Sequence, residues 1–125
     1  MILDTNALSA FADGDESLGA QLASAPELCL PVTVLGEYRF GVRQSRHRKA
    51  YEEWLGQALR ELAVLPVLES TAEHYAALCH ELKKAGTPIP TNDAWVAAAC
   101  REHSLPVVSR DAHFDLVRGL RRIEW

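Results

Sequence analysis

The sequence predicts an α/β domain with a short, mainly parallel sheet. Short apolar runs typical of strands alternate with longer segments in which apolar residues recur at helical spacing. No internal repeat, low-complexity tract or linker interrupts this alternation. Strands that alternate with helices are typical of parallel sheets covered by those helices. At 125 residues the chain is long enough to bury one core, so we expect a single domain over residues 1–125.

Five apolar runs are the expected strands. They cover residues 2–3, 28–32, 64–68, 105–109 and 120–125. Pro31 indicates a strand end or an edge position in the second run, because proline has no N–H group for a sheet ladder.

The first three helices are expected between the early strands. Thr5 or Asn6 offers a capping side chain for the first helix, Gly14 ends it, and a second short helix follows. Thr33 is the expected cap of a third helix, which runs through Glu37 to about residue 43.

The later helices have clearer patterns. Residues 51–62 carry apolar side chains at i, i+3, i+4 and i+7 throughout. Ser70 and Glu73 form a capping-box pattern before the next helix, which Gly86 ends. Thr91 or Asn92 is expected to cap an almost wholly apolar helix that lies deep in the fold. The side chains expected on the buried face of the helix that follows Ser70 are Ala72, Tyr75, Ala76, Cys79 and Leu82.

Four acidic residues lie at expected strand ends and helix starts, which is where a parallel sheet binds ligands. Asp4 and Asp111 follow expected strands, Glu37 lies in the first turns of the helix after residues 28–32, and Asp93 opens the apolar helix. In an open parallel sheet, ligands bind at the edge where strands end and the following helices begin. We therefore expect the four carboxylates at one edge of the sheet.

Carboxylates gathered in this way repel one another unless a cation lies among them. Oxygen ligands of this kind suit a hard divalent metal such as Mg²⁺, which activates water and neutralises a phosphate, so the pattern indicates phosphodiester chemistry. The histidines show no zinc-ligand spacing and no glycine-rich phosphate loop is present. Neither a zinc site nor a nucleotide triphosphatase is therefore expected.

Each acid also has an ordinary structural interpretation. Asp4 and Asp93 could be helix caps, Glu37 a surface residue and Asp111 part of a turn. His113 is expected to be a surface imidazole, with a catalytic or phosphate-binding role as the alternative. Trp95 lies on so apolar a helix that we expect it in the core or at a dimer interface. Stacking on an RNA base is the alternative.

The net charge of −4 argues against indiscriminate nucleic-acid binding through a basic surface. The basic residues are nevertheless clustered, at residues 39–49 and again at residues 118–122. If these clusters border the acids, they could hold a polyanion. Solvated helix surface is the alternative.

The cysteines, which are odd in number and share no CxxC spacing, are expected to be reduced core residues. The N-terminal residues show no basic segment followed by an apolar run, and no stretch has the apolar length of a membrane span. We therefore expect a cytoplasmic protein that does not associate with a membrane.

Four local patterns resemble the successive signatures of PIN-domain ribonucleases. They are Leu3-Asp4-Thr5-Asn6, Gly36-Glu37, Asn92-Asp93 followed by an apolar helix, and Ser109-Arg110-Asp111-Ala112-His113-Phe114. More narrowly, the chain is similar to the VapC-type toxins of toxin–antitoxin pairs. The resemblance covers essentially the whole chain, although relatives usually carry a few more residues before the first aspartate.

The resemblance implies a three-layer α/β/α fold and an endoribonuclease dependent on Mg²⁺ or Mn²⁺. Asp4, Glu37, Asp93 and Asp111 match the catalytic acids of the family, and Asn6 and Ser109 match supporting polar positions. Asp4, Asp93 and Asp111 are the expected metal ligands among them. The resemblance also implies a homodimer and a cognate antitoxin whose segment packs in a groove beside the active site. On this interpretation, Arg39, Arg43 and Arg46 are candidates for contacts with RNA phosphates.

The alternative function is a catalytically silent PIN scaffold that binds RNA or a partner protein. Two other classes of fold that carry acidic residues at a sheet edge fit poorly. A response-regulator receiver needs an acidic pair after its first strand and a lysine after its last, and a haloacid-dehalogenase phosphatase needs a second aspartate where Asn6 stands.

Overall fold

The structure is a computed structural model that describes residues 1–125. Its five strands form one sheet in the order β3-β2-β1-β4-β5, and every neighbouring pair is parallel. The strands are β1 (Ile2–Leu3), β2 (Cys29–Pro31), β3 (Ala63–Leu65), β4 (Val107–Val108) and β5 (Arg122–Ile123). The predicted α/β class and the predicted parallel sheet are confirmed.

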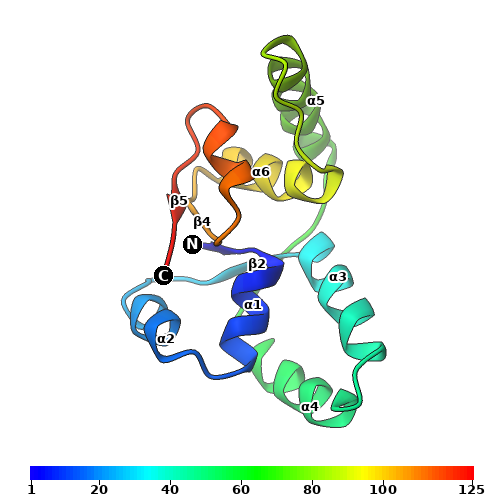
Figure 1. The fold of residues 1–125 in the computed structure, drawn as a ribbon, viewed down its shortest axis with the longest axis vertical. Coiled ribbons are helices and arrows are strands. Elements are labelled where there is room, and N and C mark those ends of the chain that lie inside the picture. The colour runs from blue at the N-terminus through cyan, green and yellow to red at the C-terminus, as the bar shows by residue number, and fades with distance from the viewer.

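Helices cover both faces of this sheet. They are α1 (Thr5–Ala12), α2 (Glu16–Ala23), α3 (Val32–Arg43), α4 (Arg48–Ala58), α5 (Glu69–Lys84) and α6 (Thr91–His103), with a 3₁₀ turn, η1 (Ala112–Leu116). In Figure 1, α1, α2 and α4 lie below the strands, and α5 and α6 lie above them. The three-layer α/β/α arrangement is therefore confirmed.

The strand order places a topological switch point between β1 and β4. From β1 the chain winds outward through β2 to β3, and it then crosses back to place β4 on the other side of β1. Connections that leave neighbouring strands in opposite directions open a crevice at the carboxyl ends of those strands, where ligands bind. Asp4 follows β1 and Ser109 follows β4, so both lie at this crevice.

The core is built on the two central strands and α6. Both residues of β1 and both residues of β4 are fully buried. Helix α6 buries Ala94, Ala97 and Ala98 against the fold, as its apolar pattern predicts. Alanine has a small side chain that loses no rotamer freedom, so α6 can lie close to its neighbours at low entropic cost.

Several predicted helix caps are wrong, because the polar side chain predicted to cap the helix lies inside it instead. Asp4, rather than Thr5 or Asn6, caps α1, and its carboxylate accepts a hydrogen bond from the Thr5 N–H. Thr33 lies inside α3 and makes no capping bond, since that helix begins at Val32, two residues earlier than predicted. Its hydroxyl is buried without a partner.

The start and buried face of α5 also differ from the prediction. The helix begins at Glu69, so Thr71 occupies the third position and its hydroxyl accepts a hydrogen bond from the Leu68 N–H at 3.0 Å. Ser70 and Glu73 therefore do not form the capping box. Of the predicted buried face, Leu82 is buried and Tyr75 and Cys79 are half-buried against the core, whereas Ala72 and Ala76 are exposed. Thr71 and Leu78 are buried in addition.

Two helix boundaries are likewise corrected. Helix α4 ends at Ala58, so the apolar positions up to Leu62 belong to the turns that lead into β3 rather than to the helix. Helix α6 begins at Thr91 directly after Pro90, so neither Thr91 nor Asn92 is its cap. Asp93 is consequently the third helical residue, in the first turn, where the helix dipole favours a negative charge.

The η1 segment depends on one buried aromatic ring. Phe114 is fully buried, whereas Leu116 in the same segment is 46% exposed. We predict that Phe114→Ala lowers the free energy of unfolding by about 3–5 kcal/mol, because it leaves a cavity in the core. Leu116→Ala is the matched control, with an expected change of only about 0.5 kcal/mol. Urea denaturation of both variants measures this, and equal midpoints would contradict it.

Candidate metal centre

Asp4 is the acid at the centre of the crevice. It directly follows β1, and the residue is only 6% exposed. One carboxylate oxygen accepts from the Thr5 N–H at 2.7 Å, and the other accepts from the Ser109 hydroxyl at 2.8 Å and the Asn6 amide at 2.9 Å. The cap and the hydrogen bonds hold the carboxylate in one orientation despite its burial.

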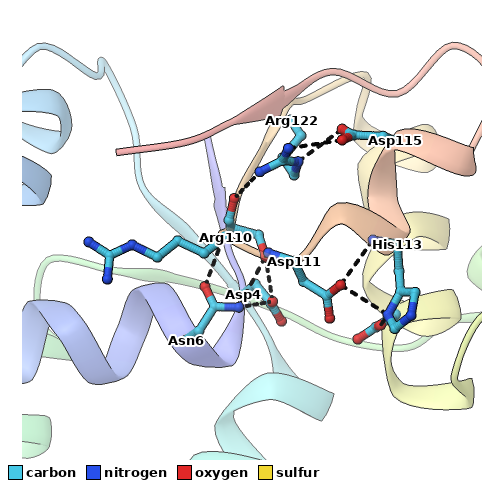
Figure 2. Close-up of polar contacts among 9 residues, drawn as sticks. Asp4, Asn6, Arg110, Asp111, His113, Asp115 and Arg122 are labelled. Carbon is cyan, nitrogen blue, oxygen red and sulfur yellow. Dashed lines mark hydrogen bonds and ion pairs between the residues drawn. The ribbon is translucent and has the colours of Figure 1, made fainter.

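Ser109 and Asn6 join the end of β1 to the end of β4. The Ser109 hydroxyl donates to Asp4 and accepts from the Asn6 amide at 3.1 Å and from the Asp111 N–H at 2.9 Å. The Asn6 side-chain oxygen accepts in turn from the Arg110 N–H at 3.2 Å. Figure 2 shows this network converging on the Asp4 carboxylate. Both residues therefore hydrogen-bond to Asp4, and the supporting role that the family resemblance implies for them stays a prediction.

Asp93 and Asp111 lie close together although they come from separate segments of the chain. Asp93 comes from the first turn of α6, and Asp111 precedes η1. The Nδ1 atom of His113 lies 3.1 Å from an Asp93 oxygen and 2.9 Å from an Asp111 oxygen. Ligand atoms of these three residues all lie within 4.8 Å of one another. In Figure 2 the Asp111 side chain points toward the His113 ring.

Glu37 reaches the site through Thr5. It is exposed on α3, and its carboxylate accepts a hydrogen bond from the Thr5 hydroxyl at 2.9 Å. Thr5 is the residue after Asp4, so Glu37 borders the same crevice. The negative charge of Glu37 contributes to raising the pKa of Asp4. The structure thus brings all four predicted acids to one edge of the sheet.

The electrostatics of the site reflect crowded negative charge. Burial, followed by the charges of Asp111 and Asp4, raises the pKa of Asp93 from 3.8 to about 6. Burial also raises the pKa of Asp4, although the hydrogen bonds from Ser109 and Thr5 oppose it. Burial alone would lower the pKa of His113, but Asp111 and Asp93 outweigh it and raise that pKa above 6.5. The acids therefore lack a full counter-charge, as expected of a site built for a cation.

The donor set fits a hard divalent cation. Asp93 and Asp111 present carboxylate oxygens close enough together to share one ion, and buried Asp4 is electrostatically coupled to both. Carboxylate oxygens suit Mg²⁺ and Mn²⁺. His113 adds a nitrogen that the sequence analysis did not assign to the cluster. Its signal in the sequence was the Asp-x-His spacing of Asp111 and His113, which places both at the start of η1.

No arginine or lysine of the chain neutralises the four acids. Arg110 follows Ser109 directly, yet its guanidinium lies 3.3 Å from an Asp15 oxygen and 4.4 Å from the centre of the Trp125 ring. Figure 2 shows the Arg110 side chain extending away from Asp4 and Asp111. The Arg122 guanidinium likewise pairs with an acid outside the quartet, 2.9 Å from an Asp115 carboxylate oxygen. The negative potential of the crevice is therefore preserved.

Three basic side chains predicted to contact a polyanion are exposed to solvent. Arg39 and Arg43 are exposed on α3, and Arg46 is exposed in the turn that follows. None of the three forms an ion pair within the chain. Trp95, expected in the core or at an interface, is half-buried and stacks on Tyr75 of α5 with ring centres 4.0 Å apart.

Comparison with known proteins agrees with this geometry. The family model described as "PIN domain" matches residues 1–120. Ribonuclease VapC5 of Mycobacterium tuberculosis is 26% identical over 125 residues, which cover 98% of this chain and 91% of that protein. The family-model match over residues 1–120 spans all four acids together with Asn6 and Ser109.

Solved structures show the same fold. One is VapBC2 from Rickettsia felis, solved bound to a DNA fragment from its promoter. A chain of that structure has a TM-score of 0.90 at 22% identity, and the alignment covers 99% of this chain and 97% of the VapBC2 chain. A chain of VapBC-5 from Mycobacterium tuberculosis, a member of the VapBC family of toxin–antitoxin systems, has a TM-score of 0.75 at 27% identity. Its alignment covers 99% of this chain and 97% of that one.

The fold places a cluster of acidic side chains at the carboxyl edge of a parallel sheet. Since the family model spans nearly the whole sequence, the chain belongs to the PIN-domain family. The resemblance seen in the sequence motifs is therefore confirmed. A separate finding is that no helix of the structure has both the length and the apolar character needed to cross a membrane.

The raised pKa of Asp93 makes the metal-free protein less stable at neutral pH. Because the pKa is higher in the folded chain, the stability associated with protonated Asp93 is fully present below about pH 3.8 and is lost as the pH rises through about 6. We predict that Asp93→Asn, which cannot ionise, stabilises the metal-free protein at pH 7.5 by on the order of 1–3 kcal/mol.

Thermal unfolding in EDTA at pH 7.5 and at pH 4 measures this difference. The gain should shrink at pH 4, where the wild-type carboxyl is largely protonated. Glu53→Gln, which removes an exposed acid on α4, is the matched control and should change neither value. An Asp93→Asn variant that is less stable than wild type at pH 7.5 would contradict the prediction.

Proposed function

We propose that this protein is a metal-dependent endoribonuclease that acts as the toxin of a toxin–antitoxin pair. The observation that supports this most directly is the convergence of Asp4, Glu37, Asp93 and Asp111 at the switch point with no arginine or lysine among them. Membership in the PIN-domain family and the similarity to Ribonuclease VapC5 provide the substrate class, RNA.

Asp4, Asp93 and Asp111 would hold the cation, either Mg²⁺ or Mn²⁺. When bound, such a cation activates water and neutralises charge on the phosphate during in-line displacement. Ser109 and Asn6 hold Asp4 in place, and the Thr5 hydroxyl orients Glu37. His113 is close enough to Asp93 and Asp111 to share a proton with either carboxylate.

The remaining family features are part of the same proposal. Arg39, Arg43 and Arg46 would contact RNA phosphates, since they are exposed cations without partners in the chain. A cognate antitoxin is the proposed protein partner, because similar structures come from VapBC complexes. A homodimer is proposed from the family resemblance, and the cytoplasm is the proposed compartment because the RNA substrate is there.

Removing a ligand charge should abolish cleavage without unfolding the protein. We predict that Asp4→Asn and Asp93→Asn each lower the rate of RNA cleavage in Mg²⁺ or Mn²⁺ by roughly 100-fold or more, because the cation site loses a ligand. Glu16→Gln, an exposed acid on α2, is the control and should cleave at the wild-type rate. Gel analysis of a labelled RNA measures the rate, and circular dichroism checks the fold. Full activity in either aspartate variant would refute the ligand assignment.

Metal binding separates the enzyme from the silent scaffold. We expect calorimetry to detect binding of Mn²⁺ to the wild-type protein at millimolar or lower concentration and to find weaker binding in Asp93→Asn. EDTA should stop cleavage, and added Mn²⁺ should restore it. Cleavage that persists in EDTA would exclude the metal route, whereas RNA binding without metal binding would favour the scaffold.

A further inference from the structure

The second basic cluster of the sequence lies at the opposite edge of the sheet from the acidic crevice. Arg118 and Arg121, in the segment before β5, line a cavity of about 490 Å³ together with Arg101 in the last turn of α6. Leu105 and Pro106, which lead into β4, line it as well. Residues that precede the strands of a parallel sheet lie at its amino edge, so this cluster does not border the four acids.

A second cavity continues from this one along the end of α5. Its volume is about 790 Å³, and it shares Arg101, Arg118 and Gly119 with the first. Its other charged residues are Lys84 and Glu81. We call the two cavities together the arginine groove. Small-molecule sites span roughly 300–1,000 Å³, so the arginine groove has room for several linked groups rather than for one small ion.

The arginine groove keeps a net positive charge. Glu81 lies 2.7 Å from Arg101 and is its partner. The hydrogen bond from Arg101 lowers the pKa of Glu81, and the charge of Arg118 adds to this effect, so Glu81 is ionised and offsets one cation. Arg118, Arg121 and Lys84 are exposed, and none of them forms an ion pair. These three cations are therefore not neutralised by an acid of the chain.

The turn that carries Arg118 and Arg121 is held against α6. The Arg101 guanidinium donates a hydrogen bond to the Arg118 carbonyl at 2.9 Å. Gly119 has a φ of +80°, a left-handed conformation that glycine adopts without steric cost. Arg122, which belongs to the same cluster in the sequence, pairs with an acid of η1 instead (Figure 2). The side chains of Arg118 and Arg121 thus start from a fixed turn and have no partner of their own.

The arginine groove and the acidic crevice lie at the two ends of the same elements. Pro106 precedes β4 and Ser109 follows it, and extended backbone advances about 3.3 Å per residue, so the two ends are roughly 10 Å apart. Asp93 and Arg101 likewise lie in the first and last turns of α6. Because β5 is the outer strand of the sheet, an extended ligand can pass from the crevice to the groove around that edge.

We propose that the arginine groove binds backbone phosphates of RNA that lie outside the scissile position. The inference rests on the proposed nuclease function, which places one RNA phosphate at the acidic crevice. The four acids there bind a cation but repel the remaining phosphates, so the rest of the RNA requires cations elsewhere. The planar guanidinium of arginine matches the oxygens of a phosphate, and Leu105, Pro106 and Leu120 offer apolar contact to the sugars.

Arg118→Gln and Arg121→Gln test the groove without removing a side-chain contact that holds the fold. Binding of a labelled single-stranded RNA of roughly 16 nucleotides is followed by fluorescence anisotropy in EDTA, which prevents metal-dependent cleavage. We expect each variant to reduce the slope of log K against log salt concentration by about 0.7, because one phosphate contact is lost. The double variant should bind about 10-fold more weakly at physiological salt.

Arg60→Gln is the matched control for charge. Arg60 is exposed between α4 and β3, at the other end of the sheet from β5, and it forms no ion pair. Its substitution removes the same charge and should leave the salt slope as in the wild type. Arg121→Lys keeps the charge and should also keep the slope. Slopes that are unchanged in both groove variants, or that fall equally in Arg60→Gln, would overturn the proposal.

NMR titration identifies the source of the phosphate. The Nε–Hε resonances of Arg118 and Arg121, assigned from the two glutamine variants, are followed while RNA, inorganic phosphate or an aspartate-rich peptide is added to the full chain. We expect RNA to shift both resonances at phosphate concentrations at which inorganic phosphate does not, because its phosphates are linked. Equal shifts with inorganic phosphate would overturn the assignment to RNA. Shifts with the peptide alone would overturn it in favour of an acidic protein.

These experiments separate failure of the groove from failure of the nuclease function. RNA binding that depends on Arg118 and Arg121, without any cleavage in Mg²⁺ or Mn²⁺, would support the groove and refute the nuclease. Metal-dependent cleavage by the wild type, together with RNA binding that neither variant weakens, would refute the groove alone.

Discussion

The hydrogen bond from Ser109 to Asp4 is the constraint on which the site depends. It joins the carboxyl ends of β1 and β4, two short strands that lie far apart in the sequence but are adjacent in the sheet. The Ser109 hydroxyl also accepts from the Asp111 N–H, so one side chain fixes the positions of two acids. Because Asp4 is buried, these bonds compensate for the water it has lost. Without them, the short sheet would bring the acids close together but would not orient them.

The same arrangement lowers stability in order to preserve function. Burial, together with the charges of neighbouring acids, raises the pKa of Asp93 and of Asp4, so the folded chain disfavours their ionised forms. A basic residue next to them would relieve this cost, and Arg110 is adjacent in the sequence. Its guanidinium is instead held by Asp15 and Trp125, so the crevice keeps its charge for a ligand. His113 supplies only a weak and exchangeable compensation.

The sequence predicted the fold class, the strand positions and the meeting of the four acids, because these depend on apolar periodicity and on where strands end. It was less successful with helix caps. Thr33, Ser70 and Thr91 are all good capping residues, but each lies inside its helix. Pro31 and Pro90 directly precede α3 and α6, and the Thr71 hydroxyl accepts from the Leu68 N–H at the start of α5. His113 was expected at the surface, and it is exposed, yet its contact with Asp93 depends on the tertiary packing of η1 against α6. No local pattern encodes that contact.

The hydroxyl of Tyr38 is buried without a hydrogen-bond partner, which could not have been found from the sequence for the same reason. Tyr38 lies on the buried face of α3 together with Val34 and Val42. What distinguishes it is a missing partner, which becomes visible only when α1 and α4 are packed against α3.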